Sequence, residues 1–111
     1  MSREAAFAAL TALLRPYAEK LPVRTDGETE LWLDEDRSTG KPQLFAAAQL
    51  RKSYSALHVY GVYVHPDLLL PRDPALLKRM QGKSCFNFKS EDQVLHEEIK
   101  ALLADAYASL P

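Results

Sequence analysis

The sequence predicts one α+β domain in which an antiparallel or mixed sheet packs against helices. Two observations lead to this prediction. Apolar residues recur at helical spacing near both ends of the chain, and segments in which polar and apolar residues alternate lie between them. The predicted element order is therefore α-β-β-β-α-β-α. Because a chain of 111 residues suits one hydrophobic core, residues 1–111 are expected to fold as a single domain.

The first helix is expected over about residues 3–19, with Ser2 as its N-cap. Its large apolar residues follow one another at steps of three and four, which places them on one stripe: Phe7, Leu10, Leu14 and Tyr17. Pro16 lacks a backbone donor. A kink or an early end near Arg15 is therefore an alternative to a straight helix.

Two more helices are predicted in the second half of the chain. A short one over about residues 74–81 is indicated by the pair Asp73-Pro74 at its start and by Gly82 at its end. The last helix is expected to open with a capping box that begins at Ser90. Its apolar stripe consists of Leu95, Ile99, Leu102 and Ala106.

Four strands are predicted from alternation and from turn residues. The first covers residues 28–33. Two β-rich segments, residues 44–51 and 54–64, are separated by a short turn, which is typical of an antiparallel hairpin. Gly61 indicates a bulge or bend within the second of them. The fourth strand covers residues 84–89.

Alternation divides the strand side chains between two faces of the sheet. The better core set is Leu31, Leu33, Leu44, Ala46, Ala48, Leu50, Leu57, Val59, Phe86 and Phe88. The second set mixes aromatic rings with polar groups: Trp32, Phe45, Gln49, Arg51, Tyr54, His58, Tyr60, Cys85, Asn87 and Lys89. If all helices cover the core face, the second face is open to solvent and available to a partner. If helices lie on both faces, it is sheltered, and the sequence leaves both alternatives open.

Composition argues against several classes of protein. The 14 basic and 15 acidic side chains give a net charge of −1, whereas binding of duplex nucleic acid relies on many cationic contacts to phosphates. One cysteine cannot form an intramolecular disulfide. No apolar run is long enough for a membrane-spanning helix. The N-terminal apolar stretch lacks a signal cleavage motif, so a cytoplasmic location is expected.

The sequence shows no complete catalytic constellation, which favours a protein that is not an enzyme. The tripeptide beginning at Gly82 resembles the end of a phosphate-binding loop, but Leu77 stands where that loop requires glycine. Cys85 and His58 share the second face, and a thiol–imidazole pair would form there if their strands are neighbours. No third group that would orient the imidazole is evident. A packed strand cysteine is the simpler interpretation.

Charge is distributed unevenly along the chain. Six acidic residues and no basic ones occupy positions 26–36: Asp26, Glu28, Glu30, Asp34, Glu35 and Asp36. Carboxylate oxygens suit hard cations such as iron, although a solvated strand edge and loop is the simpler interpretation. Positions 74–90 contain only basic charges: Lys78, Arg79, Lys83 and Lys89. They indicate either a solvated surface or a weak site for an anion or an acidic partner.

Two segments resemble a known family. Residues 54–58 read YSALH, and residues 77–89 read LKRMQGKSCFNFK. This pattern is similar to that of the small bacterial YdhG-like domains of unknown function, over about residues 43–103. The resemblance implies an α+β domain with a sheet flanked by helices. Some relatives are described as frataxin-like iron chaperones, which implies an acidic ridge on the first helix and the first strand. The first helix offers only Glu4 and Glu19, and the acidic cluster at positions 26–36 partly substitutes for the ridge.

Two functional hypotheses follow. The preferred one is a non-enzymatic binding or adaptor module without a cofactor, which contacts an unidentified protein or small ligand through Trp32, Phe45, His58, Tyr60 and Lys83. Homodimerisation through the same sheet face is an alternative use of it. The second hypothesis is a frataxin-like iron carrier that binds iron with Glu28, Glu30, Asp34, Glu35 and Asp36.

Overall fold

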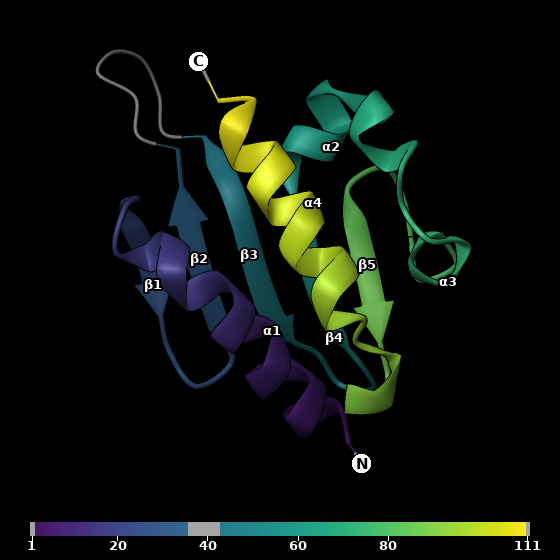
Figure 1. Cartoon of the computed structure of the whole chain (residues 1–111). Coiled ribbons are helices and arrows are strands. Elements are labelled where there is room, and N and C mark those ends of the chain that lie inside the picture. The colour runs from purple at the N-terminus through teal and green to yellow at the C-terminus, as the bar shows by residue number, and fades with distance from the viewer. Residues whose placement is uncertain (1, 36–42, 111) are drawn as a thin grey trace.

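In the described part of the chain, five strands form one antiparallel sheet in which neighbours in sequence are also neighbours in space, in the order β1-β2-β3-β4-β5 (Figure 1). The computed structural model describes residues 2–35 and 43–110. The strands are β1 Val23–Asp26, β2 Glu30–Asp34, β3 Leu44–Leu50, β4 Ser55–Val59 and β5 Cys85–Phe88. The predicted α+β class is confirmed, and the sheet is antiparallel throughout the described chain.

The helices lie on one side of this sheet, with α1 and α4 running across its face (Figure 1). The elements are α1 Arg3–Ala18, α2 Tyr60–Val64, α3 Pro74–Leu77 and α4 His96–Ala108, with 3-10 turns η1 Pro66–Leu69 and η2 Glu91–Gln93. All buried side chains of the four α-helices belong to one cluster with the core face of the sheet. None of the helices in the described residues is long and apolar enough to cross a membrane.

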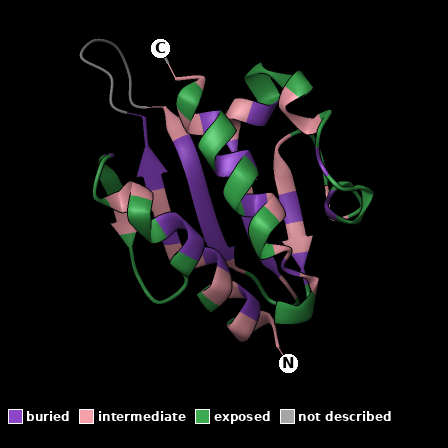
Figure 2. Ribbon diagram, viewed as in Figure 1, coloured by how far each residue is buried: buried purple, intermediate pink, exposed green. Residues whose placement is uncertain are grey.

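The core therefore fills the space between the sheet and the helices. Its sheet contribution is close to the predicted core face: Leu31, Leu33, Ala46, Ala48, Leu57, Val59, Phe86 and Phe88 are all fully buried. Burial concentrates on β3 and on the sheet-facing sides of α1 and α4 (Figure 2). Leu44 and Leu50, at the two ends of β3, are only partly buried.

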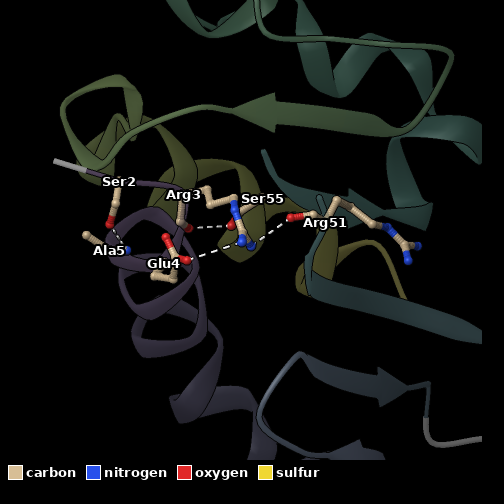
Figure 3. Close-up of polar contacts among 6 residues, drawn as sticks. All are labelled: Ser2, Arg3, Glu4, Ala5, Arg51 and Ser55. Carbon is tan, nitrogen blue, oxygen red and sulfur yellow. Dashed lines mark hydrogen bonds and ion pairs between the residues drawn. The ribbon is translucent and has the colours of Figure 1, made fainter. Parts of the chain in front are cut away.

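Hydrogen bonds connect the first turn of α1 to the turn between β3 and β4 and to the start of β4 (Figure 3). Ser2 caps the helix by accepting a hydrogen bond from the Ala5 amide at 3.1 Å, as predicted. The Arg3 guanidinium donates to the Arg51 carbonyl at 2.9 Å, and the Ser55 hydroxyl donates to the Arg3 carbonyl at 2.5 Å. The helix continues past Pro16 to Ala18. Figure 3 shows the Arg51 side chain directed away from α1.

The predicted strand over residues 54–64 is too long. It ends at Val59, and Tyr60–Val64 forms the short helix α2. Gly61 marks the change of direction because the chain approaches α4 closely there: a Cβ at this position would lie 3.3 Å from the Ala106 Cβ. Tyr60 is consequently not a sheet residue, and its predicted place on the second face is wrong.

Two other differences from the prediction have local causes. The strand β1 was not predicted, because four residues that are mostly exposed carry no clear alternation. The last helix begins at His96 rather than near Ser90. The Gln93 side chain accepts a hydrogen bond from the Lys89 amide at 2.8 Å. The predicted capping box at Ser90 is therefore replaced by the turn η2.

Phe45 lies in the core, which corrects its predicted place on the second face. Leu33 pairs with Ala46 and Asp34 pairs with Leu44, so Phe45 is an extra, unpaired residue in β3. Such a bulge interrupts the alternation and turns two successive side chains toward the same side. Phe45 is 1% exposed, and its ring centroid lies 5.4 Å from that of Tyr17 in α1.

Candidate functional site

The face of the sheet opposite the helices carries mixed polar and aromatic side chains, and we call it the uncovered face. Strand pairing places Trp32, Ala47, His58 and Cys85 in one row across β2–β5, and Glu30, Gln49, Ala56 and Asn87 in the next. Ala47 and Ala56 are buried but lie outside the core cluster. No helix of the described chain contributes a buried side chain to this face.

At the β2 end of the uncovered face, Trp32 is held by a charged pair. Its indole N–H donates to Asp34 at 2.8 Å, and the Arg24 guanidinium donates to the other carboxylate oxygen at 2.9 Å. Arg24 also lies over the indole ring, 5.4 Å from its centroid. The Asp34 side chain is 8% exposed, so this carboxylate is already occupied by two donors.

The centre of the uncovered face is a chain of polar contacts. The Gln49 amide donates to Glu30 at 2.5 Å, and the Arg51 guanidinium donates to the Gln49 carbonyl oxygen at 2.6 Å. Glu30 and Gln49 are cross-strand partners on β2 and β3. Direct cross-strand pairs stabilise a sheet. The two hydrogen bonds therefore fix the positions of the Glu30, Gln49 and Arg51 side chains.

Cys85 and His58 are neighbours, as the sequence had suggested for adjacent strands. The Cys85 Sγ lies 3.7 Å from the His58 Nε2, and the thiol donates to the Asn87 side-chain oxygen at 3.4 Å. Burial lowers the pKa of His58, and Arg51 lowers it further against the opposing effect of Glu30. Burial raises the pKa of the Cys85 thiol. Neutral imidazole and protonated thiol suit hydrogen bonding to a ligand better than nucleophilic attack.

Beyond Cys85, the uncovered face ends in a polar cavity of about 380 Å³, which we call the β5 cavity. Six side chains line it: Tyr54, Arg79, Gln81, Asn87, Lys89 and Gln93. Two of them are cations, and no carboxylate is among them. Neither Arg79 nor Lys89 has an ion-pair partner within residues 2–35 and 43–110. The cavity is thus rich in hydrogen-bond donors and positive in charge.

The position of Arg79 and Gln81 follows from a short pairing along the outer edge of β5. The Asn87 amide donates to the Arg79 carbonyl at 2.7 Å, and the Gln81 amide donates to the Cys85 carbonyl at 2.8 Å. Met80 pairs with Phe86 between them. Because side chains alternate in extended chain, Arg79 and Gln81 share the face of Asn87, while Met80 packs against the core.

Sequence reasoning missed this pairing by extending the second helix to residue 81. The α3 helix starts as predicted, with Asp73 accepting from the Ala75 amide at 2.8 Å, but it ends at Leu77. The alternation of Arg79, Met80 and Gln81 is the signal that was available. Three residues of that pattern are too few to distinguish a strand from a helix end.

The five predicted binding residues fall into three places. Trp32 and His58 share the uncovered face, and Phe45 lies in the core. The Tyr60 ring contacts that of Tyr63 in α2, with 5.8 Å between the centroids. Lys83 lies over the Tyr63 ring, 5.8 Å from its centroid. Tyr60 and Lys83 therefore belong to the α2 end of the molecule.

The predicted iron ligands are not gathered into a site. Within the described ranges, no group of three or more histidine, cysteine, aspartate or glutamate side chains is arranged to hold a metal ion. Asp34 accepts from Arg24 and Trp32, and Glu30 accepts from Gln49. Glu28 is exposed in the turn before β2, whereas Glu35 is buried after it. Asp36 lies outside the described residues.

Comparison with known proteins adds no identification. No family model, no curated protein and no solved structure matches this chain. The features that bear on function are therefore the geometry of the uncovered face and that of the β5 cavity.

Proposed function

We propose that this protein is a non-enzymatic binding module whose uncovered face binds a small anionic ligand at the β5 cavity. The observation that supports the proposal is the pair of cations, Arg79 and Lys89, that line one cavity without a carboxylate partner in the described chain. A carboxylate or phosphate group would supply the missing negative charge. Arginine and lysine are the usual ligands for both groups.

The other side chains of the β5 cavity favour recognition of oxygen atoms. Gln81, Asn87 and Gln93 each contribute an amide, and Tyr54 contributes a phenol. Side-chain amides donate two hydrogen bonds and accept through the oxygen. The Asn87 oxygen already accepts from the Cys85 thiol, which turns the amide N–H groups toward other acceptors. The volume of about 380 Å³ lies within the range of small-molecule sites.

The ligand would extend from the β5 cavity along the neighbouring row of the uncovered face. Cys85 and His58 follow Asn87 in the direction of Trp32. Both are half-buried and offer uncharged polar groups. This direction agrees with the preferred sequence hypothesis, in which His58 and Trp32 contact a ligand or partner. The proposal adds Arg79 and Lys89 as the residues that bind the anionic group, and neither was among the predicted binding residues.

Nuclear magnetic resonance titration with inorganic phosphate and with citrate tests the proposal. The side-chain amides of Gln81, Asn87 and Gln93 give their own signals, which should move and reach saturation. The variants Arg79→Gln and Lys89→Gln should each weaken binding by at least about tenfold, because a hydrogen bond to a charged group contributes roughly 1.5–3 kcal/mol. Phosphate and citrate distinguish a site for phosphate from one for carboxylates.

Lys100→Gln is the matched control, since it removes the same charge from an exposed position on α4. Its binding should equal that of the unaltered protein. If Lys100→Gln weakens binding as much as Arg79→Gln, the attraction is a general effect of charge and the β5 cavity is not the site. Amide signals that do not move with either anion would also contradict the proposal.

Two wider expectations belong to this proposal as well. The relationship to YdhG-like domains is supported by the motif at residues 77–89, which in the structure runs from the last residue of α3 through the edge pairing to β5. This segment supplies most of the β5 cavity. If the relationship holds, the cavity is a feature to examine in that family. A cytoplasmic location is the second expectation.

A further inference from the structure

A second cavity lies between α2, the turn η1 and the segment that leads into β5, and we call it the α2 cavity. Its volume is about 540 Å³. Six residues line it: Val62, Tyr63, Pro66, Leu69, Met80 and Lys83. Met80 and Gln81 are consecutive but serve different cavities, because alternation directs them to opposite sides of the sheet. The α2 cavity is therefore separate from the proposed anion site.

The lining of the α2 cavity is apolar except at its rim. Val62 is 1% exposed, and Leu69 and Met80 are half-buried against the core cluster. Pro66 completes the wall. Tyr63 is 53% exposed and stands at the rim of the cavity, where it is open to a ligand. An apolar cavity with few polar groups at its edge is typical of sites for small organic molecules.

Lys83 supplies the single cationic group of the lining. It lies over the Tyr63 ring, 5.8 Å from the centroid, and no carboxylate pairs with it in the part of the chain that the structure describes. A ligand with a hydrocarbon body and one terminal carboxylate matches both features. The body would contact the apolar residues, and the carboxylate would lie next to the ammonium group.

We propose that the α2 cavity binds a small monocarboxylic acid with an aliphatic or aromatic body. The Lys83 ammonium binds the carboxylate, and the Tyr63 ring forms the wall against which the body packs. Gly82 contributes by its backbone conformation: its φ of 82° belongs to the left-handed region, and the turn it forms carries Lys83 to the rim. This site does not depend on the anion site of the uncovered face.

Titration with octanoate tests the proposal, followed through the methyl signals of Val62, Leu69 and Met80. Two matched compounds separate the contributions: 1-octanol has the same chain without the charge, and acetate has the charge without the chain. Octanoate should bind with saturation and about fivefold more tightly than 1-octanol, which corresponds to an ion pair of about 1 kcal/mol. Acetate should cause no saturable change in these methyl signals.

Three variants assign the contacts. Lys83→Gln should reduce octanoate affinity to that of 1-octanol, and Tyr63→Ala should weaken both compounds alike. Lys78→Gln removes an equal charge from an exposed position that does not line the α2 cavity, so octanoate binding should be unchanged. All three positions are exposed, and the variants should therefore remain folded.

Several results would overturn the proposal. Equal affinities for octanoate and 1-octanol would exclude a carboxylate site at Lys83. Methyl signals that shift with protein concentration alone would indicate that a second copy of the chain occupies the α2 cavity. Loss of octanoate binding in Arg79→Gln, with Lys83→Gln unaffected, would place the ligand in the β5 cavity instead. The absence of any saturable shift would exclude the α2 cavity as a ligand site.

Discussion

The position of Phe45 depends on a bulge in β3, which moves its ring from the uncovered face into the core. Strict alternation in β3 predicts that its ring lies beside Ala47 on the uncovered face. The bulge opposite Leu33 adds one residue to the strand and returns the ring to the core. There it meets Tyr17 and Tyr107 at centroid distances of 5.4 and 6.0 Å. No pattern in the seven residues of β3 marks the bulge, so alternation alone was bound to fail here.

Replacement of Phe45 tests this placement. Phe45→Ala should lower the free energy of unfolding by about 3–5 kcal/mol, since it removes a fully buried ring and leaves a cavity. Phe86→Ala, a core position that the sequence did predict, should cost a similar amount. Leu70→Ala is the control, because Leu70 is 83% exposed and should matter little. Urea unfolding curves give the free energy of unfolding for all three variants. A loss for Phe45→Ala as small as that for Leu70→Ala would contradict the burial of Phe45.

At the scale of elements, the predicted helix starts and the hairpin are correct where the residues that determine them are close in sequence. The Ser2 cap, the Asp73-Pro74 start and the hairpin of β3 and β4 are confirmed because each depends on nearby residues. The α2 helix and the pairing at residues 79–81 depend instead on contacts with distant parts of the chain. The charged residues of the β5 cavity were recognised as a basic segment. The sequence did not show that Arg79 lies near Tyr54 and Asn87, because this proximity depends on the pairing of residues 79–81 with β5.

The turn at Gly82 was predicted as a helix end and a strand start, and it can be tested directly. A Cβ at Gly82 would meet nothing within 4 Å, so any cost of Gly82→Ala comes from its positive φ. We expect a loss of stability of about 1 kcal/mol. Gly82→Asn should lose less, because asparagine tolerates the left-handed region. Gly27→Ala, whose φ is not positive, should be nearly neutral in the same thermal unfolding measurement.

At the scale of the whole molecule, both edges of the sheet are protected against pairing with another chain. Residues 79–81 cover the outer edge of β5. The opposite edge, β1, has only four residues, carries Arg24 and Asp26, and is bulged. Short, charged and irregular edge strands are the usual means of preventing edge-to-edge association. The uncovered face mixes polar side chains with Trp32, and the most exposed large hydrophobic residues, such as Tyr63 and Leu70, lie elsewhere.

We therefore expect a monomer rather than the homodimer that the sequence left open. Sedimentation equilibrium over a wide concentration range should fit a single species of 12.5 kDa, since the polar side chains of the uncovered face lack the apolar centre of a stable dimer interface. The double variant Arg24→Thr and Asp26→Thr should increase self-association, because it leaves β1 uncharged but still suited to a strand. A species of twice the mass in the unaltered protein, lost on Trp32→Ala, would instead identify the uncovered face as a dimer interface.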